Sequence, residues 1–202
     1  MILRAGLLGL VLLAGIAGCN REKAPVADAP PTAAVQSLLD ERDILGVMDG
    51  LDDAVDRKDW TTAQTYFDDD VDVDFSSLGG APGRITGAGL VKNWQDALTN
   101  DKQSFHMRGG AMIAVNGDTA VVTSHGYAWT RMTTRPANND LWEVWGVYEH
   151  RLVRKAGGWR IDGLKFVKTY ERGDPSIRAP APQQTARNET PPAPPVTPPA
   201  RP

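Results

Sequence analysis

The pattern of apolar positions predicts that residues 34–99 are mostly helical. Over residues 34–59, apolar residues recur every three or four positions, which predicts a helix with one buried stripe. Similar spacing predicts shorter helices over 60–67 and 88–99. Between them, apolar and acidic residues alternate over 71–75, which predicts a short strand, and a glycine-rich loop is expected over 76–87. The stripe of the first helix consists of Ile44, Val47, Met48, Leu51 and Val55.

The residues that follow predict a four-stranded antiparallel meander. Residues 104–129 contain two runs of strand-forming residues around an Asn-Gly dipeptide, which is the strongest short-range signal for a β-hairpin. Further strands are predicted over 141–153 and 159–170, with a turn between them. Helices followed by strands indicate an α+β fold, in which three N-terminal helices pack on one face of a curved antiparallel β-sheet.

The two faces of the predicted hairpin differ in character. If the Asn-Gly dipeptide forms a two-residue loop, His106 lies opposite Tyr127 and Arg108 opposite His125. One face then combines ionisable and aromatic side chains, as a pocket lining does, and the other face is small and apolar. A bulge at Gly109-Gly110 would shift the register by one residue and exchange the faces. The pocket-like face would carry His106, Arg108, Met112, Val121, Thr123, His125, Tyr127 and Trp129.

The N-terminal residues have the pattern of an export signal. Arg4 precedes an apolar run over residues 5–16 that is too short to span a bilayer. The next residues, Ile16-Ala17-Gly18-Cys19, resemble the lipobox of bacterial lipoproteins, in which cleavage precedes a cysteine that becomes acylated. We therefore expect a lipoprotein signal peptide over 1–18 and an acylated Cys19 with a linker over 19–34, which would hold the domain at a membrane.

Cys19 is the only cysteine in the chain. No disulfide can form within the domain, so its stability must come from packing. The alternatives for a lone cysteine are a buried apolar side chain or a free thiol. Because Asn20 follows Cys19, the resemblance to Gram-negative lipoproteins implies the bacterial cell envelope, at the periplasmic face of the outer membrane.

Composition and charge narrow the range of partners and cofactors. Residues 173–202 contain most of the 15 prolines and are predicted to be a disordered tail, either a spacer or a docking segment. The formal net charge is −3 and no block of Lys or Arg occurs, so nucleic acid is not an expected partner. The sequence shows no metal-ligand spacing, Ser or Cys nucleophile motif, or phosphate-binding loop, and we predict no metal and no cofactor.

Four segments carry a resemblance to a known family. They are DRKDW (56–60), FDDDVDVDF (67–75), FHMRGGAMIAVNGDTAVV (105–122) and GGWRIDGLKF (157–166). In this order they resemble the SnoaL-like branch of the nuclear transport factor 2 (NTF2)-like superfamily, and within it the scytalone dehydratase-like proteins. The resemblance implies a cone-shaped α+β barrel over residues 35–172 that binds a small, largely apolar organic molecule.

The resemblance also implies a proton-transfer site. In scytalone dehydratase-like enzymes, a carboxylate near the end of the first helix pairs with a histidine at the start of the hairpin, and these positions are Asp56 and His106 here. Asp56 and Asp52 lie at the border of the apolar stripe, within reach of a cleft. The family's first-strand tyrosine falls on Phe75 and its second histidine falls near Arg131, so only the Asp-His pair carries over. The expected ligand pocket consists of Phe75, Arg108, His125, Tyr127, Trp129, Arg131 and Tyr148.

Three functions remain open from the sequence. The first is a membrane-tethered domain with lyase (dehydratase) or isomerase activity at Asp56 and His106. The second is a non-catalytic lipoprotein that uses the pocket to carry or sense a ligand, in which His106 is a structural histidine. The third is a scaffold. In each case we expect a homodimer formed through the apolar face of the sheet, and His150 is expected to be exposed.

Overall fold

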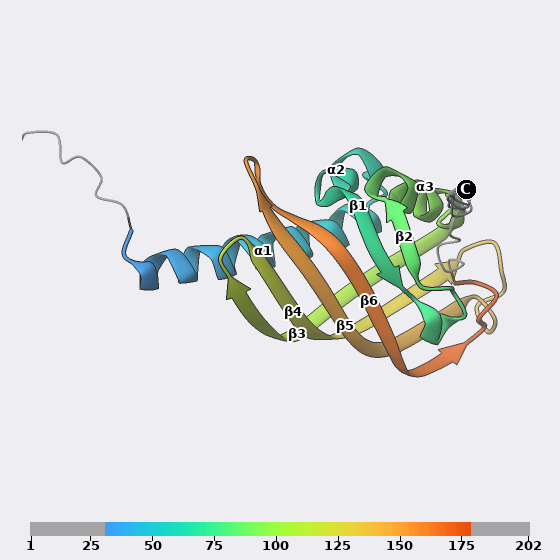
Figure 1. Cartoon of the computed structure of the whole chain (residues 1–202). Coiled ribbons are helices and arrows are strands. Elements are labelled where there is room, and N and C mark those ends of the chain that lie inside the picture. The colour runs from blue at the N-terminus through green and yellow to red at the C-terminus, as the bar shows by residue number, and fades with distance from the viewer. Residues whose placement is uncertain (1–30, 179–202) are drawn as a thin grey trace, which may run out of the picture.

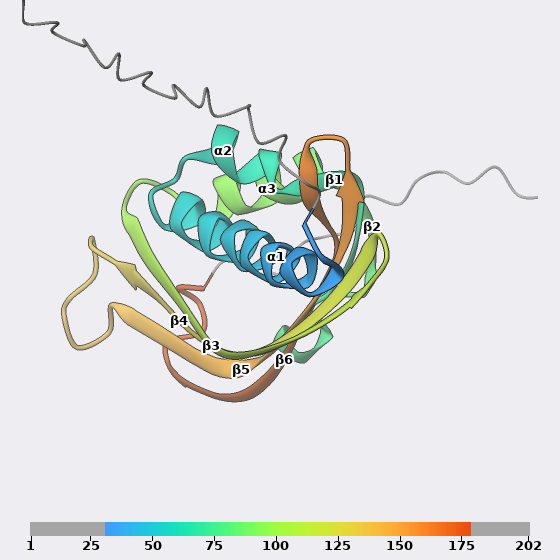
Figure 2. The same ribbon diagram turned by 90° about the vertical axis from the view of Figure 1, so that its left-hand side faces the viewer.

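In the computed structural model, which describes residues 31–178, three helices lie on the concave side of one curved sheet (Figures 1 and 2). The helices are α1 (Ala33–Asp56), α2 (Trp60–Thr65) and α3 (Gly87–Ala97). No helix among the described residues is long and apolar enough to cross a membrane. The predicted signal peptide, Cys19 and residues 179–202 of the predicted tail lie outside the described residues.

The sheet has six strands in the order β2-β1-β6-β5-β4-β3, and its strands β3 to β6 form the predicted meander. The α+β class is confirmed, but the expectation of a wholly antiparallel sheet is wrong, because β1 runs parallel to β6. β2 lies within the region expected to be a loop and pairs with β1. The strands are β1 (Phe67–Asp74), β2 (Gly83–Thr86), β3 (Lys102–Asn116), β4 (Thr119–Met132), β5 (Leu141–Lys155) and β6 (Gly158–Gly173).

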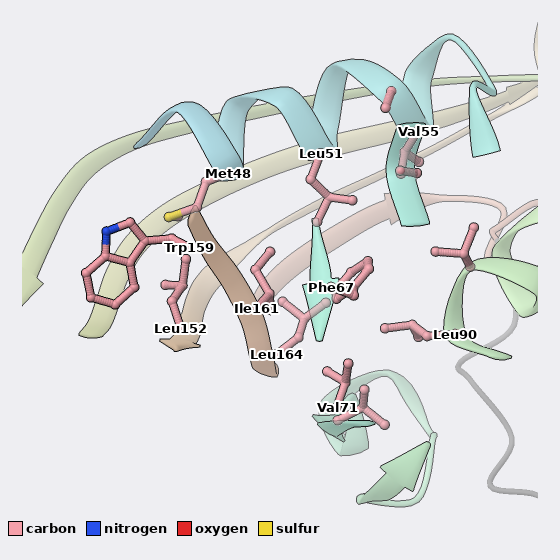
Figure 3. Close-up of a cluster of buried hydrophobic side chains, with 14 of the residues drawn as sticks. Met48, Leu51, Val55, Phe67, Val71, Leu90, Leu152, Trp159, Ile161 and Leu164 are labelled. Atoms are coloured by element: carbon pink, nitrogen blue, oxygen red, sulfur yellow. The ribbon is translucent and has the colours of Figure 1, made fainter. Parts of the chain in front are cut away.

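The predicted stripe of α1 packs into the main hydrophobic core. Met48, Leu51 and Val55 are buried and point toward Leu152, Trp159, Ile161 and Leu164 of the sheet (Figure 3). This packing fixes the rotation of α1 about its axis. The aspartates at the border of the stripe are therefore directed along the sheet toward β3.

An ion pair between a buried aspartate and a partly exposed arginine holds the first half of α1 against the sheet. Asp40 of α1 accepts two hydrogen bonds from Arg154 of β5, at 2.9 and 2.7 Å, and the guanidinium lies 4.2 Å from the centre of the Trp159 ring. The hydrogen bonds from Arg154 hold the pKa of Asp40 below its usual range, even though burial acts in the opposite direction. The two hydrogen bonds thus compensate the charge of Asp40, which a buried carboxylate requires.

The folded chain continues past the predicted limit at residue 172. Ile177 is fully buried and packs in a second cluster that includes Trp142 and Phe166. Asp174 pairs with Arg135 at 2.5 Å. Residues 173–178 therefore belong to the domain and not to the tail, although prolines follow them.

A bulge in β3 changes the register of the hairpin. Gly110 has a φ of +64°, a conformation that glycine adopts without strain, and the pairing shifts between Gly109 and Met112. As a result His106 pairs with Ala128 and Arg108 pairs with Gly126, so the predicted partners Tyr127 and His125 are wrong. The loop also moves by one residue, since β3 ends at Asn116 and β4 begins at Thr119.

The bulge places the two halves of the predicted pocket face on opposite sides of the sheet. His106 and Arg108 face the helices on the concave side. The side chains of β4 that were expected beside them lie on the convex side, which no described helix covers (Figure 2).

Candidate active site

A cavity of about 130 Å³ lies between α1, α3 and the concave face of the sheet. An apolar cavity of about 150 Å³ can hold a benzene molecule, so this volume suits a ligand with a single ring. Most of the wall is apolar, and the polar groups lie at the β3 side and on the cavity floor. The apolar wall includes Leu51, Val55, Trp94, Trp142, Val144 and Phe166, and the polar groups include Asp52, His106, Arg108, Tyr148 and His150.

Asp56, at the end of α1, binds the start of β3 through three hydrogen bonds. Its Oδ1 accepts from Ser104 Oγ at 2.9 Å and lies 2.8 Å from His106 Nδ1. Its Oδ2 accepts from the backbone N–H of His106 at 2.7 Å. An ionised carboxylate can only accept, so Nδ1 carries the hydrogen and Nε2 of the neutral ring keeps its lone pair. Nε2, which Asp56 does not contact, is therefore the nitrogen that can accept a proton.

The two members of this pair shift each other's pKa. Burial alone would raise the pKa of Asp56, but the hydrogen bonds from His106 and Ser104 outweigh burial and hold it below its usual range. Burial alone would lower the pKa of His106, but the hydrogen bond and charge of Asp56, together with the charge of Asp52, raise it. The imidazole is thus a stronger base than a free histidine side chain.

A second charged pair lies beside the first. Arg108 of β3 is only 6% exposed, and its Nη2 lies 3.0 Å from Oδ2 of Asp52 on α1. Burial raises the pKa of Asp52, and the charge of Arg108 only partly offsets that effect. Asp52 precedes Asp56 by one helical turn, so the two carboxylates lie on the same side of α1. The β3 side of the site therefore combines Asp52, Asp56, Arg108 and His106 next to the apolar wall.

The floor of the cavity contributes Tyr148 and His150 of β5. The Tyr148 ring lies directly over Gly126. A Cβ added to residue 126 would be 2.3 Å from the ring, so only glycine at residue 126 leaves room for the tyrosine. His150 is 1% exposed, and the expectation that it is exposed is wrong because its position on β5 faces the helices. Burial, with a smaller effect from Arg108, lowers the pKa of His150 to about 3, so this ring is neutral at physiological pH.

The structure brings some of the predicted pocket residues together and separates others. Phe75, Arg108 and Tyr148 line the cavity together with His106. Four others do not line it, and their assignment to the pocket is wrong: His125, Tyr127, Trp129 and Arg131.

These four residues have other surroundings, because β4 turns them to the convex side. Tyr127 donates to Glu143 at 2.7 Å and packs against Trp145, Trp129 stacks on Phe105, and Arg131 pairs with Asp140 at 2.5 Å. His125 is exposed.

No pattern in the sequence placed His150 or Trp94 at the site, although their positions on β5 and α3 bring both to the cavity. Asp52 could be found from the sequence, because it lies one turn before Asp56 and also borders the apolar stripe of α1. Within residues 31–178, no group of three or more His, Cys, Asp or Glu side chains is arranged to hold a metal ion.

The model of the SnoaL-like domain family matches residues 36–165, which is well over half of the chain. The chain belongs to the SnoaL-like domain family. A search of curated proteins finds no match for this SnoaL-like protein. The family assignment agrees with the resemblance found in the sequence.

Solved structures share the NTF2-like fold of this SnoaL-like domain at low sequence identity. A protein from Kribbella flavida is 22% identical with a TM-score of 0.64, and the match covers 70% of this chain and 97% of that one. A putative scytalone dehydratase from Novosphingobium aromaticivorans is 19% identical with a TM-score of 0.62, covering 77% and 99%. A hexachlorocyclohexane dehydrochlorinase, LinA-type3 from Novosphingobium barchaimii, is 14% identical with a TM-score of 0.57, covering 70% and 94%.

We predict that Asp56→Asn destabilises the domain by about 2 kcal/mol near pH 5.5, because an amide nitrogen would face a hydrogen-bond donor. The pKa of Asp56 is lower in the folded protein than in the unfolded chain. Its contribution to the free energy of unfolding is therefore complete above the unfolded-state pKa and is lost as the pH falls through the folded-state pKa. The pKa of His106 is higher in the folded protein than in the unfolded chain. Its contribution to the free energy of unfolding is therefore complete below the unfolded-state pKa and is lost as the pH rises through the folded-state pKa.

The difference between wild type and Asp56→Asn should therefore be largest between about pH 4 and pH 6.5. Urea denaturation at pH 3, 5.5 and 8.5 measures it. Asp53→Asn is the matched control, since Asp53 lies on the same helix but is exposed and pairs only with Arg57 at the surface. Equal effects of the two substitutions at pH 5.5 would show that Asp56 makes no special contribution.

Proposed function

We propose that this domain catalyses proton transfer on a small, largely apolar ring compound, as a lyase of the dehydratase type or as an isomerase. The observation that carries the proposal is the 2.8 Å contact between Asp56 Oδ1 and His106 Nδ1 at the wall of an apolar cavity. Asp56 orients the ring and fixes its tautomer, and His106 acts as general base through Nε2. No cofactor enters this scheme.

The proton-transfer step uses only groups in the cavity. His106 Nε2 accepts a proton from a ring carbon, and the electron pair of the broken C–H bond forms a carbon–carbon double bond. In an elimination, a hydroxyl group on the next carbon leaves as water after receiving the proton from His106. In an isomerisation, the new double bond displaces an existing one beside it, and the π electrons of that bond take the proton from His106 at its far carbon. The names of two structural neighbours, a putative scytalone dehydratase and a hexachlorocyclohexane dehydrochlorinase, support reactions of this class.

We also propose that acylated Cys19 anchors the domain to the periplasmic face of the bacterial outer membrane, with residues 20–32 as the linker. The lipobox-like residues 16–19 and the following Asn20 support this placement. A periplasmic enzyme without a cofactor needs no supply of a nucleotide or reductant from the cytoplasm. The alternative function, a non-catalytic ligand-binding or scaffolding lipoprotein, would use the same anchor.

We expect the protein to accelerate exchange of ring C–H protons for deuterium in D₂O. Single-ring ketones such as cyclohexanone are suitable probes, and loss of the α-proton signals in the NMR spectrum measures the rate. His106→Gln should slow the exchange roughly 10²- to 10⁴-fold, as expected for removal of a general base. The wild-type rate should rise with pH as the neutral fraction of His106 increases, with a midpoint above its usual pKa.

His125→Gln is the matched control for this experiment, because His125 is exposed on the convex side of the sheet and should leave the rate unchanged. An unchanged rate in His106→Gln would contradict the proposal. Ligand binding without exchange for any ring compound tested would favour the carrier function.

We propose that the homodimer forms through the convex face of the sheet. Most of the apolar hairpin face that was expected to form it is instead buried in the core, including Ala120, Val122 and Ala128. The convex face exposes apolar side chains of adjacent strands that no described helix covers, and a large exposed apolar surface typically marks an interaction site. These side chains are Phe105, Met107, Met112, Val121, Val167 and Tyr170.

Protein lacking its first 19 residues should sediment as a dimer at micromolar concentration in analytical ultracentrifugation. Met107→Glu, which places a charge on the convex face, should shift it to monomer. Leu38→Glu is the control, since Leu38 is exposed on α1, away from that face. A wild-type monomer at micromolar concentration would refute the dimer.

A further inference from the structure

Lys58, two residues after Asp56, has a backbone conformation that is unusual for a residue with a side chain. Its φ is +59°, and within residues 31–178 every other positive φ belongs to a glycine. Steric contact of the Cβ with the backbone disfavours this conformation in L-residues. α1 ends there in a Schellman motif, since the N–H of Lys58 donates to the carbonyl of Val55 at 3.0 Å and the next N–H donates to the carbonyl of Ala54 at 2.8 Å. Glycine is the usual residue at this position, so the lysine requires an explanation.

The Lys58 side chain reaches the turn that connects α3 to β3. Its Nζ donates to the carbonyl oxygen of Thr99 at 2.7 Å and to that of Lys102, the first residue of β3, at 2.6 Å. The N–H of Lys102 also donates to the carbonyl of Thr99 at 3.0 Å, so both carbonyls belong to one turn. Hydrogen bonds from an ammonium group are stronger than those between neutral groups. The two bonds therefore offset the backbone strain at residue 58, which a glycine would avoid without making these contacts.

β3 is an edge strand, and side chains from the end of α1 occupy part of its free edge. Lys58 donates to the carbonyl of Lys102, and Oδ2 of Asp56 accepts from the N–H of His106 at 2.7 Å. In the interior of a sheet, a neighbouring strand would bind backbone groups in these positions. The segment 102–106 is thus held to α1 at its first residue by Lys58 and at its last residue by Asp56.

The geometry of the Asp56–His106 pair depends on this attachment. Oδ1 of Asp56 lies 2.8 Å from Nδ1 of His106. A hydrogen bond between nitrogen and oxygen keeps to a range of about 2.7–3.2 Å, so a small displacement of the strand would break it. Without Lys58, the carbonyl of Lys102 loses its link to α1. Asp56 would then have to hold the strand and orient the imidazole at the same time.

We infer that Lys58 is a positioning residue for the proton-transfer site, because its ammonium group holds the start of β3 at the distance from α1 at which Asp56 binds Nδ1 of His106. The inference rests on the proposed function for the role of His106 as the base. Lys58 does not line the cavity, so it acts through the strand and not by contact with the ligand. Its loss should therefore slow proton transfer and leave ligand binding unchanged.

Lys58→Gly tests the inference, because glycine adopts a positive φ without strain and lets α1 end as before. We expect the pKa of His106, measured by NMR, to fall toward its usual value, since the ring is no longer held against Asp56. At a pH where the ring is neutral in both proteins, deuterium exchange of cyclohexanone should slow roughly 10- to 100-fold, as expected for a misplaced base. Titration calorimetry should show an unchanged affinity for cyclohexanone. Lys92→Met is the matched control and should change none of these values, since Lys92 is exposed on α3 and pairs with Asp96 at the surface.

A chemical rescue isolates the contribution of the ammonium group. The chain without its first 19 residues contains no cysteine, so Lys58→Cys introduces a single thiol. Alkylation of this thiol with 2-bromoethylamine gives a thioether analogue of lysine, which should restore the pKa of His106 and the exchange rate. Alkylation with 1-iodopropane adds an uncharged group of the same length and should restore neither.

The outcomes separate this inference from the proposed function. Exchange that depends on His106 but is unchanged in Lys58→Gly would refute the inference and leave the proposed function intact. Full recovery with the uncharged propyl group would also overturn the inference. A wild-type protein without any exchange, in which the pKa of His106 still depends on Lys58, would refute catalysis and uphold the positioning of the ring.

Discussion

The site depends on one carboxylate that joins the end of a helix to the start of an edge strand. Asp56 accepts three hydrogen bonds from Ser104 and His106, two from side chains and one from the backbone. These bonds fix where α1 ends relative to β3 and which nitrogen of His106 carries its proton. The carboxylate oxygens of Asp56 thus determine both the position of α1 against β3 and the tautomer of His106.

The surrounding structure makes this arrangement useful for chemistry. The α1 stripe packs on the sheet and closes one side of an apolar cavity, while the ion pair of Asp40 with Arg154 holds the other end of the helix. In an apolar cavity, charges interact more strongly than in water, so Asp56 and Asp52 raise the basicity of His106 despite its burial. The fold thereby provides a base that is partly buried beside a largely apolar cavity.

Much of this could be predicted from the sequence, because it depends on local periodicity. The helical spacing of α1 predicted both the buried stripe and the border position of Asp56, and the resemblance to SnoaL-like proteins paired Asp56 with His106. The hairpin was recognisable from its Asn-Gly dipeptide, although the loop lies one residue further along.

The errors have a common physical cause, since they depend on register and long-range pairing. The bulge at Gly110 turns His106 and Arg108 to the concave side while Tyr127 and Trp129 stay on the convex side. Local sequence shows that a bulge can form there but not that it does. The parallel pairing of β1 with β6 and the burial of Ile177 depend on contacts with distant residues, which no local pattern encodes.

The most direct test of this account is an NMR titration of the His106 ring nitrogens in ¹⁵N-labelled protein, in the wild type and in Asp56→Asn. The account predicts that His106 titrates above about 6.5, the usual value for histidine, that its neutral form carries the proton on Nδ1, and that Asp56→Asn lowers the pKa. A wild-type pKa at or below that value, or a neutral ring protonated on Nε2, would contradict the account.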